Sequence, residues 1–195
     1  MTEEKLNEYK SLLKNRLNEK RYHHSLCVAD EAKFLAVKYG ADPEKAFTAG
    51  LLHDITKNAP TEEHLKLFKD YNIELSDIEK SSEKLWHAVS GAVYVKFVLG
   101  INDEEIISAI RYHTTAKQDM TLLEKVLYIA DFTSLDRDYD DIDVIRALSR
   151  ESLDKAMKYA LSYTINELVD KGVAIHNDTF FAYNQSVIKE MQNDF

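Results

Sequence analysis

The sequence has 195 residues, of which 45% are hydrophobic, and a formal net charge of −9 at pH 7. That length is enough for one domain, residues 1–195, with a sizeable core. Five glycines and two prolines are few for an all-β or loop-rich protein, and the acidic charge argues against a broad nucleic-acid surface. The single cysteine, Cys27, excludes an internal disulfide framework and fits a reducing cytosol.

Nothing in the sequence indicates a membrane segment or an export signal. The apolar runs are all shorter than the roughly 20 residues that cross a bilayer. Residues 1–5 start a charged helix and lack the apolar core of a signal peptide. We therefore expect a cytoplasmic protein that binds neither membrane nor nucleic acid.

Apolar residues recur at helical spacing along nearly the whole chain, which predicts an all-α fold. Gly40 is expected to end one helix, and Asp42-Pro43 to start the next. Residues 71–82 are ambiguous between loop and helix, and the Asp-rich residues 133–143 form the longest expected loop. The predicted helices span about 3–19, 22–39, 43–57, a short segment from 61, 82–98, a segment from 103 that bears His113, 120–132, 151–171 and 178–191.

The pair His53-Asp54 lies in the otherwise apolar predicted helix 43–57. Residues of these types are rarely buried unless they are paired or bound to a metal. Neighbouring residues on a helix point about 100° apart, so one cation near the helix surface can contact both side chains. The pair is therefore the centre of a candidate site.

Three other histidines lie on predicted helices that face the core. His24 shares a stripe with Leu35, and His113 ends the stripe that contains Ile110. His87 has small neighbours that allow another helix or a ligand to approach closely. For each of these histidines the alternative is a core imidazole that is hydrogen-bonded within the fold.

Two charged residues, Asp131 and Lys57, complete the candidate list, whereas His64 is not part of it. Asp131 follows the apolar turn at Leu127 and needs a cationic partner if it is buried, unless it caps the helix end. Lys57 lies one turn beyond His53 and can neutralise a substrate phosphate, or can simply be solvated. His64 follows two glutamates, and we expect it to be a solvated surface residue.

Imidazoles and carboxylates from several helices suit a borderline metal, namely iron, manganese, cobalt or zinc. A carboxylate at Asp54 can bridge two ions. Such a site acidifies water and polarises phosphoryl oxygens. The residues alone therefore predict metal-dependent phosphoryl hydrolysis.

The order His24, His53-Asp54, Asp131 resembles the signature of HD-domain metal phosphohydrolases, which are helical bundles. The sequence around these residues is similar to the YqeK branch of that superfamily. The similarity extends over nearly the whole chain, including residues 172–179. It implies an iron-dependent homodimer with one or two ions, a core at about 20–140, and C-terminal helices that complete the nucleotide site. The motifs are RYHHSL (21–26), AGLLHDITK (49–57), YHTT (112–115) and LEKVLYIAD (123–131).

The resemblance also implies residue roles. The implied metal ligands are His24, His53, Asp54 and Asp131. The implied catalytic residues are Asp54, Lys57, His87 and His113, where the two histidines hold a second metal, contact phosphate or donate a proton to the leaving group. Implied substrate contacts come from Arg21, Lys57, His87, His113, Arg137 and the loop Val173, Ala174, Ile175, His176, Asn177 and Asp178.

Three departures from the family pattern lie outside the implied ligands. Asn177 stands where the family usually has a proline after the histidine, and Ala116 replaces a frequent glycine. The turn 133–137 lacks the common Glu-Pro, although Arg137 is retained. The departures therefore change the loops around the expected site and leave its implied ligands in place.

Three hypotheses for function follow. The first is a hydrolase that cleaves diadenosine tetraphosphate symmetrically to two ADP. A second keeps the chemistry but acts on ppGpp-like alarmones or mononucleotides. The third is a nucleotide-sensing interaction module in which the metal pocket binds without turnover.

Overall fold

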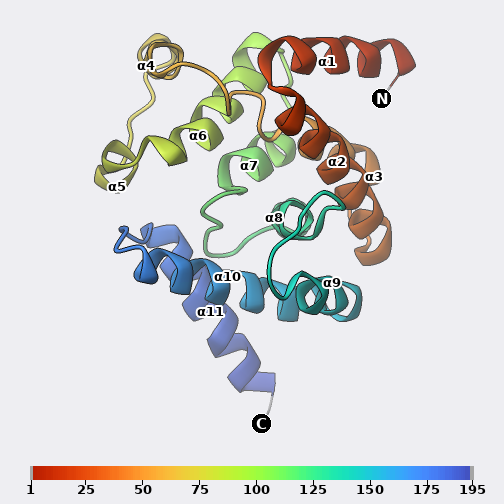
Figure 1. The fold of residues 1–195 in the computed structure, drawn as a ribbon, viewed down its shortest axis with the longest axis vertical. Helices are drawn as coiled ribbons and strands as arrows, with labels where there is room; N and C mark the ends of the chain where they lie inside the picture. Colours follow the sequence, from red (N-terminus) through yellow and green to blue (C-terminus); the bar gives the residue numbers. More distant parts are fainter. Residues whose placement is uncertain (1, 194–195) are drawn as a thin grey trace.

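The computed structural model describes residues 2–193, and every regular element in that range is a helix (Figure 1). The predicted all-α fold is confirmed. The C-terminal helices lie at one end of the molecule, beyond α8, and α1, α4 and α6 lie at the other (Figure 1). The α-helices are α1 (Glu3–Arg16), α2 (Glu19–Tyr39), α3 (Pro43–Leu52), α4 (Thr61–Asp70), α5 (Asp77–Ser81), α6 (Trp86–Val93), α7 (Glu104–Tyr112), α8 (Leu122–Thr133), α9 (Ile142–Glu151), α10 (Leu153–Asp170) and α11 (Asn177–Asn193).

Local capping chemistry sets several of these boundaries. Asp42 accepts hydrogen bonds from two backbone N–H groups at the start of α3, and Pro43 occupies the first turn. Asp103 caps α7 in the same way. Gly40 ends α2 with φ of +81°, a left-handed conformation that favours glycine. The predicted helix end at Gly40 and helix start at Asp42-Pro43 are confirmed.

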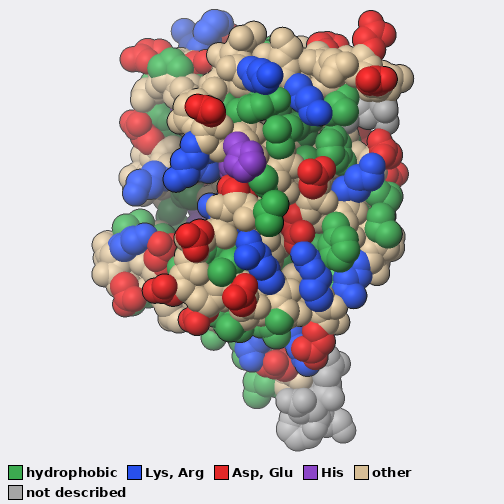
Figure 2. All heavy atoms as spheres, turned by 45° about the vertical axis from the view of Figure 1, so that its right-hand side comes forward, with side chains coloured by type: hydrophobic (Ala, Val, Ile, Leu, Met, Phe, Trp, Pro, Cys, Tyr) green, Lys and Arg blue, Asp and Glu red, His purple; other side chains and the backbone are tan. Residues whose placement is uncertain are grey.

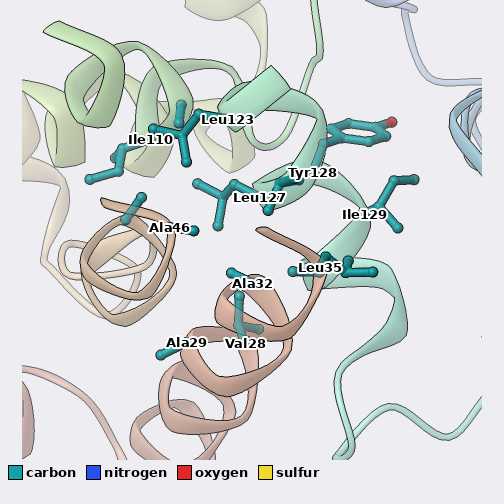
Figure 3. Close-up of a cluster of buried hydrophobic side chains, with 14 of the residues drawn as sticks. Val28, Ala29, Ala32, Leu35, Ala46, Ile110, Leu123, Leu127, Tyr128 and Ile129 are labelled. Carbon is teal, nitrogen blue, oxygen red and sulfur yellow. The ribbon is translucent and has the colours of Figure 1, made fainter. Parts of the chain in front are cut away.

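The core lies among α2, α3, α7 and α8 (Figure 3). Val28 and Leu35 of α2 lie near Leu127 of α8, with Ile110 of α7 on its other side (Figure 3). All four side chains are fully buried. Burial of an aliphatic side chain of this size contributes about 1.5–3 kcal/mol, so this layer fixes the relative positions of the helices. The polar residues of the candidate site lie on these same helices or at their ends.

The helix that bears the His53-Asp54 pair ends earlier than predicted. Regular α3 stops at Leu52, and the chain continues to residue 58 in tight turns, in which the Lys57 N–H donates to the carbonyl of Asp54. Nδ1 of His53 donates to the carbonyl of Gly50, which is the acceptor that a continuing helix would offer to Asp54. The predicted continuation to Lys57 was therefore wrong, because a side chain competes with the backbone for that carbonyl.

Two other segments differ from the prediction. Predicted helix 82–98 is divided into a 3₁₀ turn η1 (Glu83–Leu85), α6 and a π-helical turn η2 (Tyr94–Val98). The predicted loop 133–143 is shorter than expected, because α8 continues through Thr133 and the unpredicted α9 begins at Ile142. The ambiguous segment 71–82 contains the short helix α5.

His64 is buried, and its predicted place on the solvated surface was wrong. Only 7% of the residue is exposed, and its Nδ1 lies 2.7 Å from Oγ of Ser90. The rings of Phe68 and Trp86 lie next to it. The two preceding glutamates gave a misleading signal, because His64 lies on the face of α4 that packs against α6.

Two further observations concern the apolar character of the helices and the charges on the surface. None of the described helices combines the length and the apolar character that a membrane crossing requires. On the face shown in Figure 2, lysine and arginine side chains are interspersed with aspartate and glutamate.

Gly50 permits the close contact between α2 and α3, the most extensive contact between described helices. A Cβ at this position would lie 2.8 Å from Cα of Ala29 and 2.9 Å from the carbonyl oxygen of Val28. Both neighbours are backbone atoms of α2, so they cannot move without shifting that helix. Gly50 therefore sets the distance between the two helices that carry His24 and His53.

We expect Gly50→Ala to lower the free energy of unfolding by about 1–3 kcal/mol, because the added methyl group forces α2 and α3 apart. Urea unfolding followed by circular dichroism measures this change. Gly91→Ala is the matched control, because its Cβ would meet ordinary contacts at 3.4 Å or more, and alanine is the better helix former. A Gly50→Ala protein as stable as the unmutated protein would contradict the close-contact interpretation.

Candidate functional site

The His53-Asp54 pair lies at the end of α3 and is buried, with His53 fully enclosed. Nδ1 of His53 is 2.7 Å from the carbonyl of Gly50. Because a carbonyl only accepts, the proton lies on Nδ1 and the lone pair on Nε2. That Nε2 is buried and has no hydrogen-bond partner, and burial lowers the His53 pKa to about 4. A neutral imidazole with an unused buried lone pair suits a metal cation.

The other three histidines of the site are held in the same way. In each, Nδ1 is occupied by an oxygen acceptor, so Nε2 is left for the interior of the site. Metal-binding histidines commonly have this arrangement, which fixes the tautomer and the orientation of the ring. The acceptors are Asp136 Oδ2 for His24 (2.8 Å), the Lys84 carbonyl for His87 (2.8 Å) and the Ile110 carbonyl for His113 (2.7 Å).

Within residues 2–193, two groups of side chains have ligand atoms within 4.8 Å of one another, and they share His53. One consists of His24, His53 and Asp131, and the other of His53, Asp54 and His113. The fold thus brings together all four implied ligands and one of the two further histidines. Nitrogen and oxygen donors of this kind fit a borderline divalent metal.

His87 lies beside the second group. Its Nε2 is 3.2 Å from Nε2 of His113, 3.3 Å from Oδ1 of Asp54 and 2.9 Å from Nζ of Lys57. Burial and the neighbouring Lys57 hold the His87 pKa well below its usual range, so the imidazole is neutral and accepts a hydrogen bond from the ammonium. Burial also lowers the Lys57 pKa. Thr114 completes this corner, with Oγ1 3.1 Å from Nε2 of His113.

Each carboxylate of the cluster, buried Asp54 and partly buried Asp131, is balanced by positive charge. Asp54 lies 3.0 Å from Nη1 of Arg21 and 3.8 Å from Nζ of Lys57. Asp131 contacts Arg137, which also donates from Nε to the Asp131 carbonyl at 2.7 Å. Burial alone would raise the pKa of both carboxyl groups, but the histidines and cations around them hold it well below the usual range. Both aspartates are therefore ionised at neutral pH.

His24 differs from His53 and His87 in having a raised pKa. Burial lowers its pKa, but hydrogen bonds with Asp131 (2.9 Å) and Asp136 (2.8 Å) outweigh burial and raise the pKa to about 9. The carboxylates that attract a proton to this nitrogen also attract a metal cation. Asp136 was not among the predicted site residues, because its role depends on the fold of the loop after α8.

The cluster opens into a cavity of about 420 Å³, a volume within the usual range of small-molecule sites. The members of the cluster that line this cavity are Asp54, His87, His113 and Asp131. Three cations reach it, although the whole chain is acidic. Its lining residues are Arg21, Asp54, Lys57, His87, His113, Thr114, Asp131, Phe132, Arg137, Tyr139, Tyr163 and Glu167.

The predicted nucleotide-side loop 173–178 does not line this cavity. Its His176 lies 3.4 Å from Oγ of Ser76 and 3.9 Å from Glu79, in the loop and helix around α5. Contact of this loop with a nucleotide stays a prediction. In its place the cavity receives Tyr163 and Glu167 from α10, for which the sequence gave no local signal.

A larger cavity of about 910 Å³ lies between the start of α8, α10 and α11. None of the predicted site residues lines it, and its lysines are paired with carboxylates, as in Lys125 with Asp154 at 2.8 Å. The smaller cavity carries the titratable cluster and is therefore the candidate site.

Comparison with known proteins places the candidate metal ligands within a matched family domain. Residues 21–136 match the HD domain family. A protein of Bacillus subtilis named symmetrical bis(5'-nucleosyl)-tetraphosphatase is 37% identical over 172 residues, which cover 88% of this chain and 92% of the relative. A protein of Halalkalibacterium halodurans with the same name is 36% identical and covers 92% of this chain and 95% of the relative.

A solved structure agrees with the fold. A predicted HD superfamily hydrolase involved in NAD metabolism, from Clostridium acetobutylicum, superimposes with a TM-score of 0.91 at 38% identity. The match covers 94% of this chain and 97% of that one. The chain therefore belongs to the HD domain family, among relatives named symmetrical bis(5'-nucleosyl)-tetraphosphatase.

Proposed function

We propose that this protein is a metal-dependent phosphoanhydride hydrolase that cleaves diadenosine tetraphosphate symmetrically to two ADP. The observation that supports it best is a buried imidazole and carboxylate cluster that opens into a cavity with Arg21, Lys57 and Arg137. A polyphosphate requires this combination of metal ligands and cations. The symmetric position of the cut is supported by the names of the relatives.

His24, His53, Asp54 and Asp131 would hold the metal, and His113 would join them if there is a second ion. Iron is the metal that the family resemblance implies, and the donor set also fits manganese, cobalt or zinc. When bound, the metal supplies a Lewis acid for the phosphoryl oxygens and acidifies water. The unused lone pair of His53 supports this assignment.

The cations around the cluster would bind and orient the polyphosphate. Arg21 and Arg137 already touch the carboxylates of Asp54 and Asp131, so a phosphate in the cavity would share them. Nζ of Lys57 lies 2.9 Å from Nε2 of His87 and 3.8 Å from Oδ1 of Asp54. We assign to this pair the stabilisation of charge on the phosphate, or donation of a proton to the leaving ADP.

Two further parts of the proposal depend on the family resemblance. The first is a homodimer, which light scattering of the purified protein would test. The second is a nucleotide contact for loop 173–178, whose His176 lies against α5 within one chain.

With iron-loaded protein, we expect diadenosine tetraphosphate to yield two ADP, resolved by chromatography, and the reaction to stop when a chelator removes the metal. AMP plus ATP would overturn the symmetric cut. If no metal gives turnover of this substrate, the substrate assignment is wrong, and hydrolysis of ppGpp-like alarmones or mononucleotides becomes the hypothesis to test.

Asp54→Asn is the matched loss-of-function variant, because it keeps the shape of a buried side chain and removes the charge. We expect turnover to fall at least about 100-fold. Mutation of a residue that only hydrogen-bonds to a metal ligand already lowers metal affinity or activity about 10–100-fold. Nucleotide binding by the unmutated protein without any turnover would favour the sensing module.

We also expect Asp136→Ala to weaken metal affinity about 10–100-fold, because the His24 ring loses the acceptor that fixes its tautomer. Competition with a chromogenic chelator measures this affinity directly. Asp136→Asn keeps an oxygen acceptor and should restore most of it. The control is Asp138→Ala, an exposed residue of the same loop. Equal metal affinity in the alanine variant and the unmutated protein would show that Asp136 has no part in the metal site.

A further inference from the structure

Three aromatic side chains line one part of the cavity: Phe132, Tyr139 and Tyr163. We call them the aromatic wall. Their ring centroids lie 6.4 Å apart between Phe132 and Tyr163, and 5.5 Å apart between Tyr139 and Tyr163. They come from the end of α8, the following loop and the middle of α10. The hydrolytic role proposed above does not use them.

The wall is continuous with the charged part of the cavity. Phe132 directly follows Asp131 in α8, and Arg137 lies two residues before Tyr139 in the loop. All of these residues line the same cavity. A ligand whose phosphates lie against Arg137 would therefore have its other end close to the wall.

The wall is supported from behind and open in front. The ring of Phe132 packs against fully buried Tyr128, with centroids 5.4 Å apart. The hydroxyl of Tyr139 donates to the Phe132 carbonyl at 3.0 Å, which holds the loop against α8. Tyr163, in contrast, is 36% exposed. Tyr163 is therefore the most accessible ring of the wall, since Phe132 and Tyr139 are partly buried.

We propose that the aromatic wall is the subsite for the nucleobase, with Tyr163 as its main stacking surface. This inference rests on the proposed function and adds to it the place where the base binds. Aromatic faces stack on any nucleobase, and offset or tilted packing with the rings 4.5–7 Å apart is their favoured geometry. The Tyr139 hydroxyl is already used within the protein, so Tyr139 would contact the base through the face of its ring.

Calorimetric titration of the metal-loaded protein with ADP and with pyrophosphate, which lacks a base, tests the proposal. We expect Tyr163→Ala to weaken ADP binding about 5- to 150-fold more than pyrophosphate binding, the range for loss of one stacked base. Tyr163→Phe keeps the ring and should keep ADP affinity close to that of the unmutated protein. Phe97→Ala is the control, because it removes an exposed ring that stacks on Tyr71 outside the cavity.

Equal effects of Tyr163→Ala on both ligands, or no effect on either, would overturn the subsite, as would an unmutated protein that does not bind ADP. The test is separate from that of the proposed function. If diadenosine tetraphosphate is not cleaved but Tyr163→Ala weakens ADP selectively, the subsite stands and the substrate assignment fails. If two ADP are formed but the two ligands respond alike, only the subsite fails.

Discussion

The site depends on the close contact of α3 with α2 at Gly50. The missing side chain lets the two helix backbones touch, and the carbonyl of the same glycine accepts the Nδ1 proton of His53. One residue thus sets both the distance between two helices and the tautomer of the central imidazole. A shift of α3 against α2 would change the distance from His53 to His24, whereas the hydrogen bond from His53 to Gly50 is made within α3 and would move with the ring.

Around that contact, the charges of the site are balanced within the fold. Two ionised carboxylates, buried Asp54 and partly buried Asp131, lie among four imidazoles and are held by Arg21, Lys57 and Arg137. An unpaired buried charge is strongly destabilising, so these pairs stabilise the folded state. The same pairing keeps the cations in the cavity, where an incoming polyphosphate can compete for them. An acidic chain can therefore present a cationic site.

Most of the helices could be predicted from apolar periodicity and capping residues, because both signals are local. The misplaced end of α3 came from a side chain that competes with the backbone, and the buried His64 came from packing of α4 on α6. Within the site, the four imidazoles, Asp54 and Asp131 could be predicted because each lies on a helix or at its end, where a polar residue among apolar ones is conspicuous. Asp136 and Tyr163 could not, because only the tertiary fold brings the loop after α8 and the middle of α10 to the cavity.

The two candidate ligand groups have His53 in common, and this has a consequence for stoichiometry. An imidazole nitrogen has a single lone pair, so Nε2 of His53 can complete one group at a time. With one ion, the protein has two overlapping positions, one nearer His24 and Asp131 and the other nearer Asp54 and His113. With two ions, one of them would have to be held without His53, by the remaining imidazoles and carboxylates of the two groups. The second ion would then be the more weakly held and the first to exchange with solvent.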